Sequence, residues 1–279
     1  MRPSVRTLQM APATLYYVAL FLIPLLMLAV YSFYSVESFE PVPKLTLDNY
    51  VEAATSDVFR GFYLRTLRVA LTVALIVTLI SFPFAFVLNY VLPARKHVVY
   101  FMVLVSLFGG YIVRVYAWRN IMGREGVVNQ TLLGLGVVDR PVTLFLNSEL
   151  AVIVALVNYL IPFGILPIYA AMQNVPVGQV EAAQDLGGSR WLAARRVVLP
   201  LTSQGCVAAF AISFIATSAE WVTPQLLGGT GDQLIGNQIQ HQFGGGLNWP
   251  LGAALALTMV VLVVALLGLA YAVIRRWLR

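Results

Sequence analysis

The sequence predicts an all-α membrane protein with six transmembrane helices and both termini on the cytoplasmic side. Three observations predict it: the composition, the number of long apolar segments, and the distribution of basic residues between them. Of the 279 residues, 59% are hydrophobic and 11% are charged, and the mean hydropathy is +0.82. A soluble domain carries about 25% charged residues, so the composition excludes an ordinary soluble protein. The net charge of +6 is therefore interpreted as a topology signal, and no nucleic-acid partner is expected.

Six apolar segments are long enough to cross a membrane, since a hydrocarbon core of about 30 Å needs about 20 residues of helix. They cover approximately 14–34, 66–90, 97–117, 150–171, 202–223 and 250–273. The first is expected to be a retained span, because it is too long for a signal-peptide core and no clear small-x-small cleavage site precedes Glu37. Pro162 and Pro167 are expected to kink the fourth span.

The orientation follows from lysine and arginine in the connections, because an excess of these residues marks the cytoplasmic side. The two ends of the chain and the alternate connections hold ten of the eighteen basic residues and two acids, Glu181 and Asp185. The ten are Arg2, Arg6, Arg95, Lys96, Arg190, Arg195, Arg196, Arg275, Arg276 and Arg279. The opposite connections hold eight basic residues and nine acids. Both termini are therefore placed inside, and the acidic connection 37–62 is placed outside.

The sequence predicts local structure in two other outward connections. The connection 118–149 is long enough for a short helix over Glu125 to Leu135. The connection 224–249 is rich in glycine, and apolar and aromatic residues alternate with the glycines. Because glycine allows close backbone packing, this connection is expected to turn back toward a cavity and not to be a flexible surface loop.

The sequence offers little for catalysis. It contains no G-x-x-x-x-G-K-[ST] phosphate loop, no H-E-x-x-H and no G-x-S-x-G. The single cysteine, Cys206, cannot form a disulfide within one copy. An enzyme is therefore poorly supported, no cofactor is expected on this chain, and a channel or secondary carrier remains an alternative. If ATP drives transport, the ATPase must be another chain.

One polar, helix-forming block lies between the fourth and fifth spans. Asn174-Val175-Pro176 offers a helix start, and Glu181 and Asp185 then lie on one face. Gly187-Gly188 is expected to break the helix, and Ser189 to cap a second one in which Trp191, Ala194, Arg195 and Val198 share a side and which Pro200 ends. Two short helices at an angle suit docking onto a separate protein. The alternative is an amphipathic helix lying on the lipid.

The same block resembles the EAA signature of the permeases of ABC importers. The resemblance is carried by Glu181-Ala182-Ala183, by Gly187 four residues later, and by the ending Val197-Val198-Leu199-Pro200, in which Val197 replaces the usual isoleucine. It implies a type I ABC importer permease fold with coupling helices at about 176–199, seated in a groove of the nucleotide-binding subunit. It assigns Glu181, Ala182, Ala183 and Gly187 to the coupling core, and the full set expected to couple to the ATPase adds Asp185 and Arg190 of the same block.

A second resemblance covers nearly the whole chain. Segment 64–70 is similar to the segment that opens the core of these permeases, and segments 222–229, 235–243 and 248–254 are similar to the spermidine/putrescine permease subfamily. This implies an N-terminal span with a periplasmic connection over 1–62 and a permease core over 63–275. It also implies a bacterial inner-membrane location, a second permease subunit, a periplasmic binding protein, and an ATPase dimer that carries ATP and magnesium. An opine, another amino-acid derivative or a phosphonate is the alternative substrate.

A polycation that crosses a bilayer must exchange its water for anions, carbonyl groups and aromatic faces. Glu220 is the one acid inside a predicted span, where a charge costs roughly 2.5–3.5 kcal/mol, so it should face a cavity or a partner. The alternative is an ion pair with Arg65, Arg68 or Arg114. The full set of pathway candidates is Glu220, Trp221, Tyr159, Asn158, Asp232 and Trp249.

Overall fold

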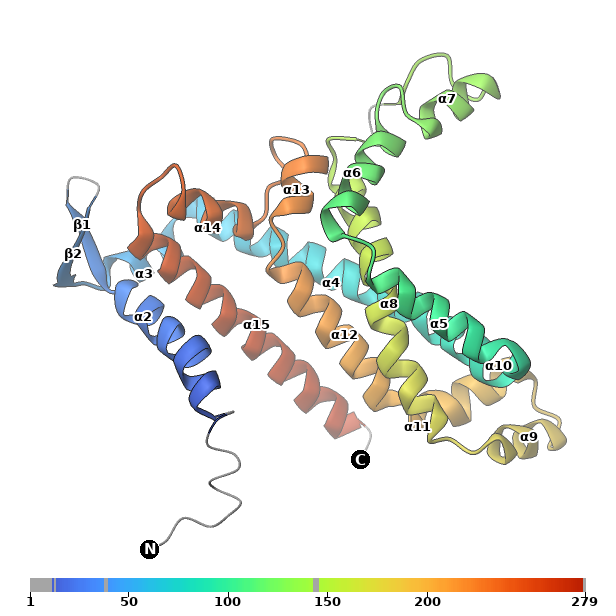
Figure 1. The fold of residues 1–279 in the computed structure, drawn as a ribbon. Helices are drawn as coiled ribbons and strands as arrows, with labels where there is room; N and C mark the ends of the chain where they lie inside the picture. The colour runs from blue at the N-terminus through green and yellow to red at the C-terminus, as the bar shows by residue number, and fades with distance from the viewer. Residues whose placement is uncertain (1–11, 13, 38–39, 143–145, 278–279) are drawn as a thin grey trace, which may run out of the picture. The chain divides into compact units, whose positions relative to one another are not determined.

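The structure is a computed structural model that describes residue 12 and residues 14–37, 40–142 and 146–277, most of them helical (Figure 1). The chain divides into two compact units. One combines the N-terminal part up to Gly61 with Gln238–Val264, and the other combines Phe62–Asn237 with Ala265–Arg279. The expected boundary between residues 62 and 63 stays a prediction, as does the permease core over 63–275.

The first unit contains a small sheet that the all-α expectation missed. After the apolar helix Thr14–Tyr31, which includes η1 (Val18–Leu22) and α2 (Ile23–Tyr31), strand β1 (Tyr34–Glu37) pairs antiparallel with β2 (Glu40–Leu45). Helix α3 (Asp48–Thr55) follows. The Asn49 side-chain amide donates to the carbonyl oxygens of Ser32 (2.9 Å) and Tyr34 (2.8 Å). A buried amide with two acceptors therefore joins α3 to the start of the hairpin.

The second unit contains most of the other helices. Its first half consists of α4 (Asp57–Phe86, which begins in the first unit), η2 (Val87–Val91), η3 (Pro93–Arg95), α5 (Lys96–Leu107), α6 (Tyr111–Met122), α7 (Val127–Gly134) and α8 (Glu149–Gln173). Its second half consists of α9 (Val177–Asp185), α10 (Arg190–Ala193), η5 (Ala194–Val198), α11 (Leu199–Leu201), α12 (Ser203–Ser218) and α13 (Val222–Leu227). Helices α14 (Ile235–Phe243) and α15 (Trp249–Trp277) each continue from one unit into the other.

Four helices are long and apolar enough to cross a membrane: Thr14–Tyr31, Asp57–Val91, Glu149–Gln173 and Trp249–Ala272. Two bent pairs raise the number to six if each pair is one span. One pair bends by 91° between α5 and α6, and the other bends by 75° between Leu201 and Ser203. Six spans therefore stay a prediction. So does the orientation, since Arg2, Arg6 and Arg279, which support it, lie outside the described residues.

The helices differ from the expected spans in their breaks and ends. The third span is broken at Phe108-Gly109-Gly110, and the fifth ends at Ser218, five residues before the expected end. Helix α8 continues through both Pro162 and Pro167. The short helix expected over 125–135 is confirmed as α7, and the connection 224–249 contains part of α13 and all of α14.

Close packing of α12 along α8 organises the second unit (Figure 1). The contact depends on Gly205, where an added Cβ would lie 2.7 Å from the Cβ of Ala171 and 2.8 Å from the carbonyl oxygen of Pro167. Small residues allow helix backbones to approach closely in membranes, where van der Waals packing replaces the hydrophobic effect between helices. Gly205 therefore brings α12 against α8 near the end of α8 that leads to the polar block.

We expect Gly205→Ala to destabilise the protein relative to Gly268→Ala, a matched change on α15 where an added Cβ meets no atom within 4 Å. Both substitutions gain similar helix propensity, but only the first creates a clash, and overpacking costs about 1–3 kcal/mol. Thermal unfolding of the two purified variants in detergent measures the difference. Equal melting temperatures would show that α12 does not depend on this contact.

Candidate functional site

The polar block between α8 and α12 folds as two short helices joined by a sharp turn. Helix α9 ends at Asp185, and Gly187 has a φ of +85°, in the left-handed region that favours glycine. The Gly187 and Gly188 amides donate to the carbonyl oxygens of Gln184 (2.8 Å) and Ala183 (3.1 Å). This pattern is a Schellman motif, which satisfies the last carbonyl groups of a helix. The glycine break predicted from the sequence is confirmed.

The second helix begins as expected but presents a different face. Ser189 Oγ accepts a hydrogen bond from the Leu192 amide at 3.2 Å, so Ser189 caps α10. Trp191 is 68% exposed, whereas Ala194 and Val198 are buried. The expectation that these residues and Arg195 share one side was wrong, because Arg195 is exposed like Trp191. Helix residues four apart lie on the same face, so Trp191 and Arg195 share the exposed face whereas Ala194 and Val198 share the buried one. The helix also continues past Pro200 to Leu201.

We use the name coupling surface for seven exposed residues at the turn between the two helices of this block: Glu181, Ala182, Asp185, Leu186, Gly187, Arg190 and Trp191. Ala183 is only half-buried beside them, and Val180 is buried beneath. Leu186 is 90% exposed. Sequence reasoning missed Leu186, although an apolar residue beside a predicted glycine turn was a usable signal. A compact surface that combines acids with exposed leucine and tryptophan is typical of a protein-binding site.

Glu220 lies in the break between α12 and α13, which corrects its predicted position inside a span. Its Oε1 accepts hydrogen bonds from three backbone amides, those of Trp221 (3.0 Å), Val222 (2.9 Å) and Thr223 (3.2 Å). The first amides of a helix have no intrahelical partner and attract negative charge. The carboxylate of Glu220 therefore satisfies the start of α13.

The ion pair considered as an alternative for Glu220 does not form. Arg65 donates to the Gly231 carbonyl oxygen, and Arg68 pairs with Glu149. Arg114 donates to the Ser106 carbonyl oxygen. Within the described part of the chain, Glu220 takes part in no salt bridge. Its partners are backbone amides and, as described next, the lining of a cavity.

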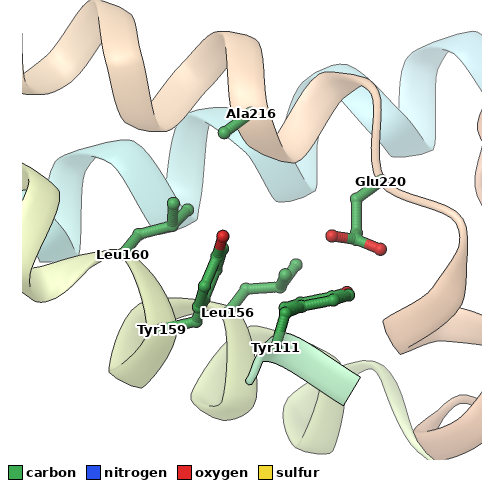
Figure 2. A pocket seen from close by; sticks show the side chains of 6 residues that line it. All are labelled: Tyr111, Leu156, Tyr159, Leu160, Ala216 and Glu220. Carbon is green, nitrogen blue, oxygen red and sulfur yellow. The ribbon is translucent and has the colours of Figure 1, made fainter. Parts of the chain in front are cut away.

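A cavity of about 180 Å³ lies beside Glu220 and is lined by Tyr111, Leu156, Tyr159, Leu160, Ala216 and Glu220. Figure 2 shows the Glu220 carboxyl group next to the ring of Tyr111, with the hydroxyl group of Tyr159 directed into the same space. The two tyrosine rings lie 4.8 Å apart at 58°. The Tyr111 hydroxyl shares a hydrogen bond of 2.6 Å with Thr223 Oγ1. The cavity therefore combines one carboxylate with two aromatic rings.

Tyr111 is a candidate that sequence reasoning missed. It is the first residue of α6, directly after Gly109-Gly110 in the break of the third span. The glycine pair inside an apolar segment was the available signal.

The other pathway candidates lie elsewhere. Asn158 Oδ1 accepts from Trp118 Nε1 at 3.2 Å and faces a second cavity of about 490 Å³. Asp232 Oδ2 accepts from the Gly229 amide at 2.9 Å. Trp221 contributes an amide to Glu220, and its side chain is 40% exposed. Trp249 belongs to the first unit, where its ring meets Phe243 edge-on with the ring centroids 5.9 Å apart. Of the six candidates, the structure brings Glu220 and Tyr159 together in one cavity.

Comparison with known proteins identifies the family. Residues 70–279 match the family described as "Binding-protein-dependent transport system inner membrane component". The chain belongs to this family. The spermidine/putrescine transport system permease protein PotB of Haemophilus influenzae is 32% identical over 231 residues, which cover 81% of this chain and 79% of PotB. PotB of Escherichia coli K12 is 31% identical over 226 residues, 81% of each chain. The inner membrane ABC transporter permease protein YdcU of Escherichia coli K12 is 31% identical over 83% of this chain and 77% of YdcU.

Two solved structures of ABC transporters share the fold. A bacterial ABC transporter involved in the import of alginate has a TM-score of 0.77 at 17% identity, covering 96% of this chain and 94% of that one. A second structure, the alginate ABC transporter in complex with an alginate pentasaccharide-bound periplasmic protein, has a TM-score of 0.78 at 18% identity and covers 97% of this chain and 94% of that one. The chain thus has the fold of an ABC importer permease, as the EAA-like residues implied.

We expect Gly187→Val to loosen the coupling surface and Gly187→Asn to preserve it. An added Cβ at Gly187 meets no atom within 4 Å, so the backbone angle alone decides the effect. A left-handed conformation costs an ordinary residue roughly 1–2 kcal/mol, and asparagine adopts it more readily than a β-branched residue. Hydrogen–deuterium exchange of the amides at 186–188 should be roughly five- to thirtyfold faster in the valine variant. Wild-type exchange in that variant would contradict this account of the turn.

Proposed function

We propose that this chain is a transmembrane permease subunit of an ATP-driven importer that carries a polyamine, of the spermidine or putrescine type, into the cytoplasm. The observation that carries the proposal is the similarity to PotB, a spermidine/putrescine permease, over 81% of the chain. The carboxylate and tyrosines of the cavity are chemically suited to such a cargo, since amines at neutral pH are cations that bind anions and aromatic faces.

In the proposed arrangement the chain crosses the bacterial inner membrane six times, with both termini in the cytoplasm. Helix α12 then links the two functional regions directly. The block that carries the coupling surface continues through α11 to Leu201, and α12 runs from Ser203 to Ser218, two residues before Glu220. Sixteen residues of helix span about 24 Å. The coupling surface would lie at the cytoplasmic end of α12 and the cavity at its outer end.

The proposed mechanism is alternating access driven by a partner. An ATPase dimer, with its own ATP and magnesium, would bind the coupling surface of this chain and the equivalent surface of a second permease subunit. Closure of the dimer on ATP would move α9 and α10, and the close packing of α12 on α8 would carry the movement to the cavity. A periplasmic binding protein would deliver the substrate when the cavity opens outward. The missing phosphate loop agrees with this division of labour.

The chemistry of the cavity supports a polyamine over the alternative substrates. A phosphonate would place its negative charge against Glu220 in a site of low dielectric constant, where like charges repel strongly. An opine or another amino-acid derivative carries an amine but also a carboxylate. Its amine would be attracted to Glu220, whereas its carboxylate would be repelled. A polyamine carries positive charges alone. The cavity therefore favours the polyamine, and the family favours the importer over a secondary carrier that acts alone.

The test is to purify this chain from its native membrane in mild detergent and to identify the chains that accompany it. The binding protein is then titrated by calorimetry with polyamines, opines and amino acids. We expect an ATPase, a second permease and a binding protein that takes spermidine or putrescine. The same partners with another ligand would overturn the assignment of a polyamine as the substrate. The lack of any ATPase would overturn the assignment of the chain to an ATP-driven importer.

A second prediction concerns the coupling surface. Glu181→Lys should leave the protein folded in the membrane but abolish uptake, because it reverses the charge of an exposed acid at the proposed contact with the ATPase. Glu125→Lys makes the same change at an exposed acid in the predicted outward connection and should keep uptake. Uptake of labelled substrate by cells that carry each variant measures the difference. Normal transport by Glu181→Lys would refute docking through this residue.

A further inference from the structure

We propose that the cavity beside α13 is a subsite for one primary ammonium group of the substrate. Glu220 supplies the countercharge, and Tyr111 and Tyr159 supply the aromatic walls. This inference rests on the proposed function and deepens it, because it names the atoms that recognise the cargo. In this subsite Glu220 acts through its negative charge and not merely as the cap of a helix.

The carboxylate is held in a fixed orientation. All three backbone amides at the start of α13 converge on a single oxygen, Oε1 of Glu220, at 2.9–3.2 Å. The second oxygen is not used by these donors. Gly236 packs against the backbone of the same residue, since an added Cβ there would lie 2.6 Å from the Glu220 carbonyl oxygen. A carboxylate positioned in this way binds a ligand without first losing its own conformational freedom.

The walls of the cavity suit a cation. Tyr159 already engages one in the structure, since the guanidinium carbon of Arg114 lies 5.5 Å from the centre of its ring. A cation within about 6 Å of an aromatic ring is attracted to its face. The Tyr111 ring lies 4.8 Å from that of Tyr159 and belongs to the same cavity as the carboxylate. Leu156, Leu160 and Ala216 add an apolar lining for the methylene groups of an aminoalkyl chain.

The charge balance indicates that the subsite takes one end of the substrate. The cavity lining contains one acid, and Arg114 lies on the Tyr159 ring nearby. One carboxylate balances one ammonium group, and a second ammonium group in the same cavity would have no second carboxylate to balance it. The remaining amines of an extended di- or tri-cation would therefore be bound outside this cavity.

The test uses the complete transporter in proteoliposomes, with its binding protein, ATP and radiolabelled putrescine. Glu220→Gln is the decisive variant because the glutamine carbonyl oxygen can still accept the three amides while the charge is lost. Its melting temperature should stay near the wild-type value, and kcat/KM for uptake should fall at least tenfold. Tyr159→Leu, which removes the aromatic face, should also lower uptake, whereas Tyr159→Phe should lower it less.

Glu149→Gln is the matched control. Glu149 is a partly exposed acid in the first turn of α8 that pairs with Arg68 and does not line the cavity. This variant should transport putrescine at close to the wild-type rate. Lack of uptake by the wild-type transporter would defeat the proposed function itself. Wild-type uptake with an unchanged Glu220→Gln variant would overturn the subsite alone and leave Glu220 as a helix cap. An equal loss of uptake in the Glu149→Gln variant would also overturn the subsite, because it would show that removing any acid in this region lowers transport.

Discussion

The fold of the second unit depends on one constraint: a helix that ends in an apolar environment must find partners for its free backbone groups. The third and fifth predicted spans are both interrupted in the second unit. The third is interrupted before Tyr111, and the fifth gives way to Glu220, whose carboxylate satisfies the start of α13. The hydrogen bond between Tyr111 and Thr223 joins the two interruptions. Glu220, which satisfies the start of α13, thus also lines the cavity, and Tyr111 at the other interruption lines it too.

The same logic connects this cavity to the coupling surface. Helix α12 is held against α8 by contacts too close for a side chain at Gly205, so the two helices are expected to move as one body. The buried face of the polar block, Val180, Ala193, Ala194 and Val198, belongs to a cluster that also includes Ile168 and Met172 of α8. A displacement of the block is therefore transmitted to packed side chains and not absorbed by a flexible loop. This rigidity is what the proposed mechanism requires.

The sequence predicted the local features well and the tertiary ones poorly. The turn at Gly187 and the cap at Ser189 depend on residues a few positions apart, and both appear as expected. The position of Glu220 was wrong because an apolar segment does not show where its helix stops. Tyr111 was missed because its role depends on α13, more than a hundred residues later. The strands β1 and β2 were not predicted because they are short and partly exposed.

The ion pair expected as an alternative for Glu220 failed for a related reason. Three arginines lie in or near the same predicted outward connections as Glu220, but each has a different partner in the folded structure. They are Arg65, Arg68 and Arg114. Charge alone does not identify a partner when backbone donors compete for the same carboxylate. Helix termini supply such donors, and their positions follow from the fold.

In the proposed function, this chain moves a polyamine with energy from a partner ATPase. The most direct measurement is accumulation of labelled putrescine in proteoliposomes that contain the complete transporter, with ATP present or absent and with ionophores that collapse all ion gradients. We predict that accumulation requires ATP and the binding protein and persists when the gradients are abolished. Accumulation that continues without ATP and stops with the ionophores would contradict the account and identify a secondary carrier.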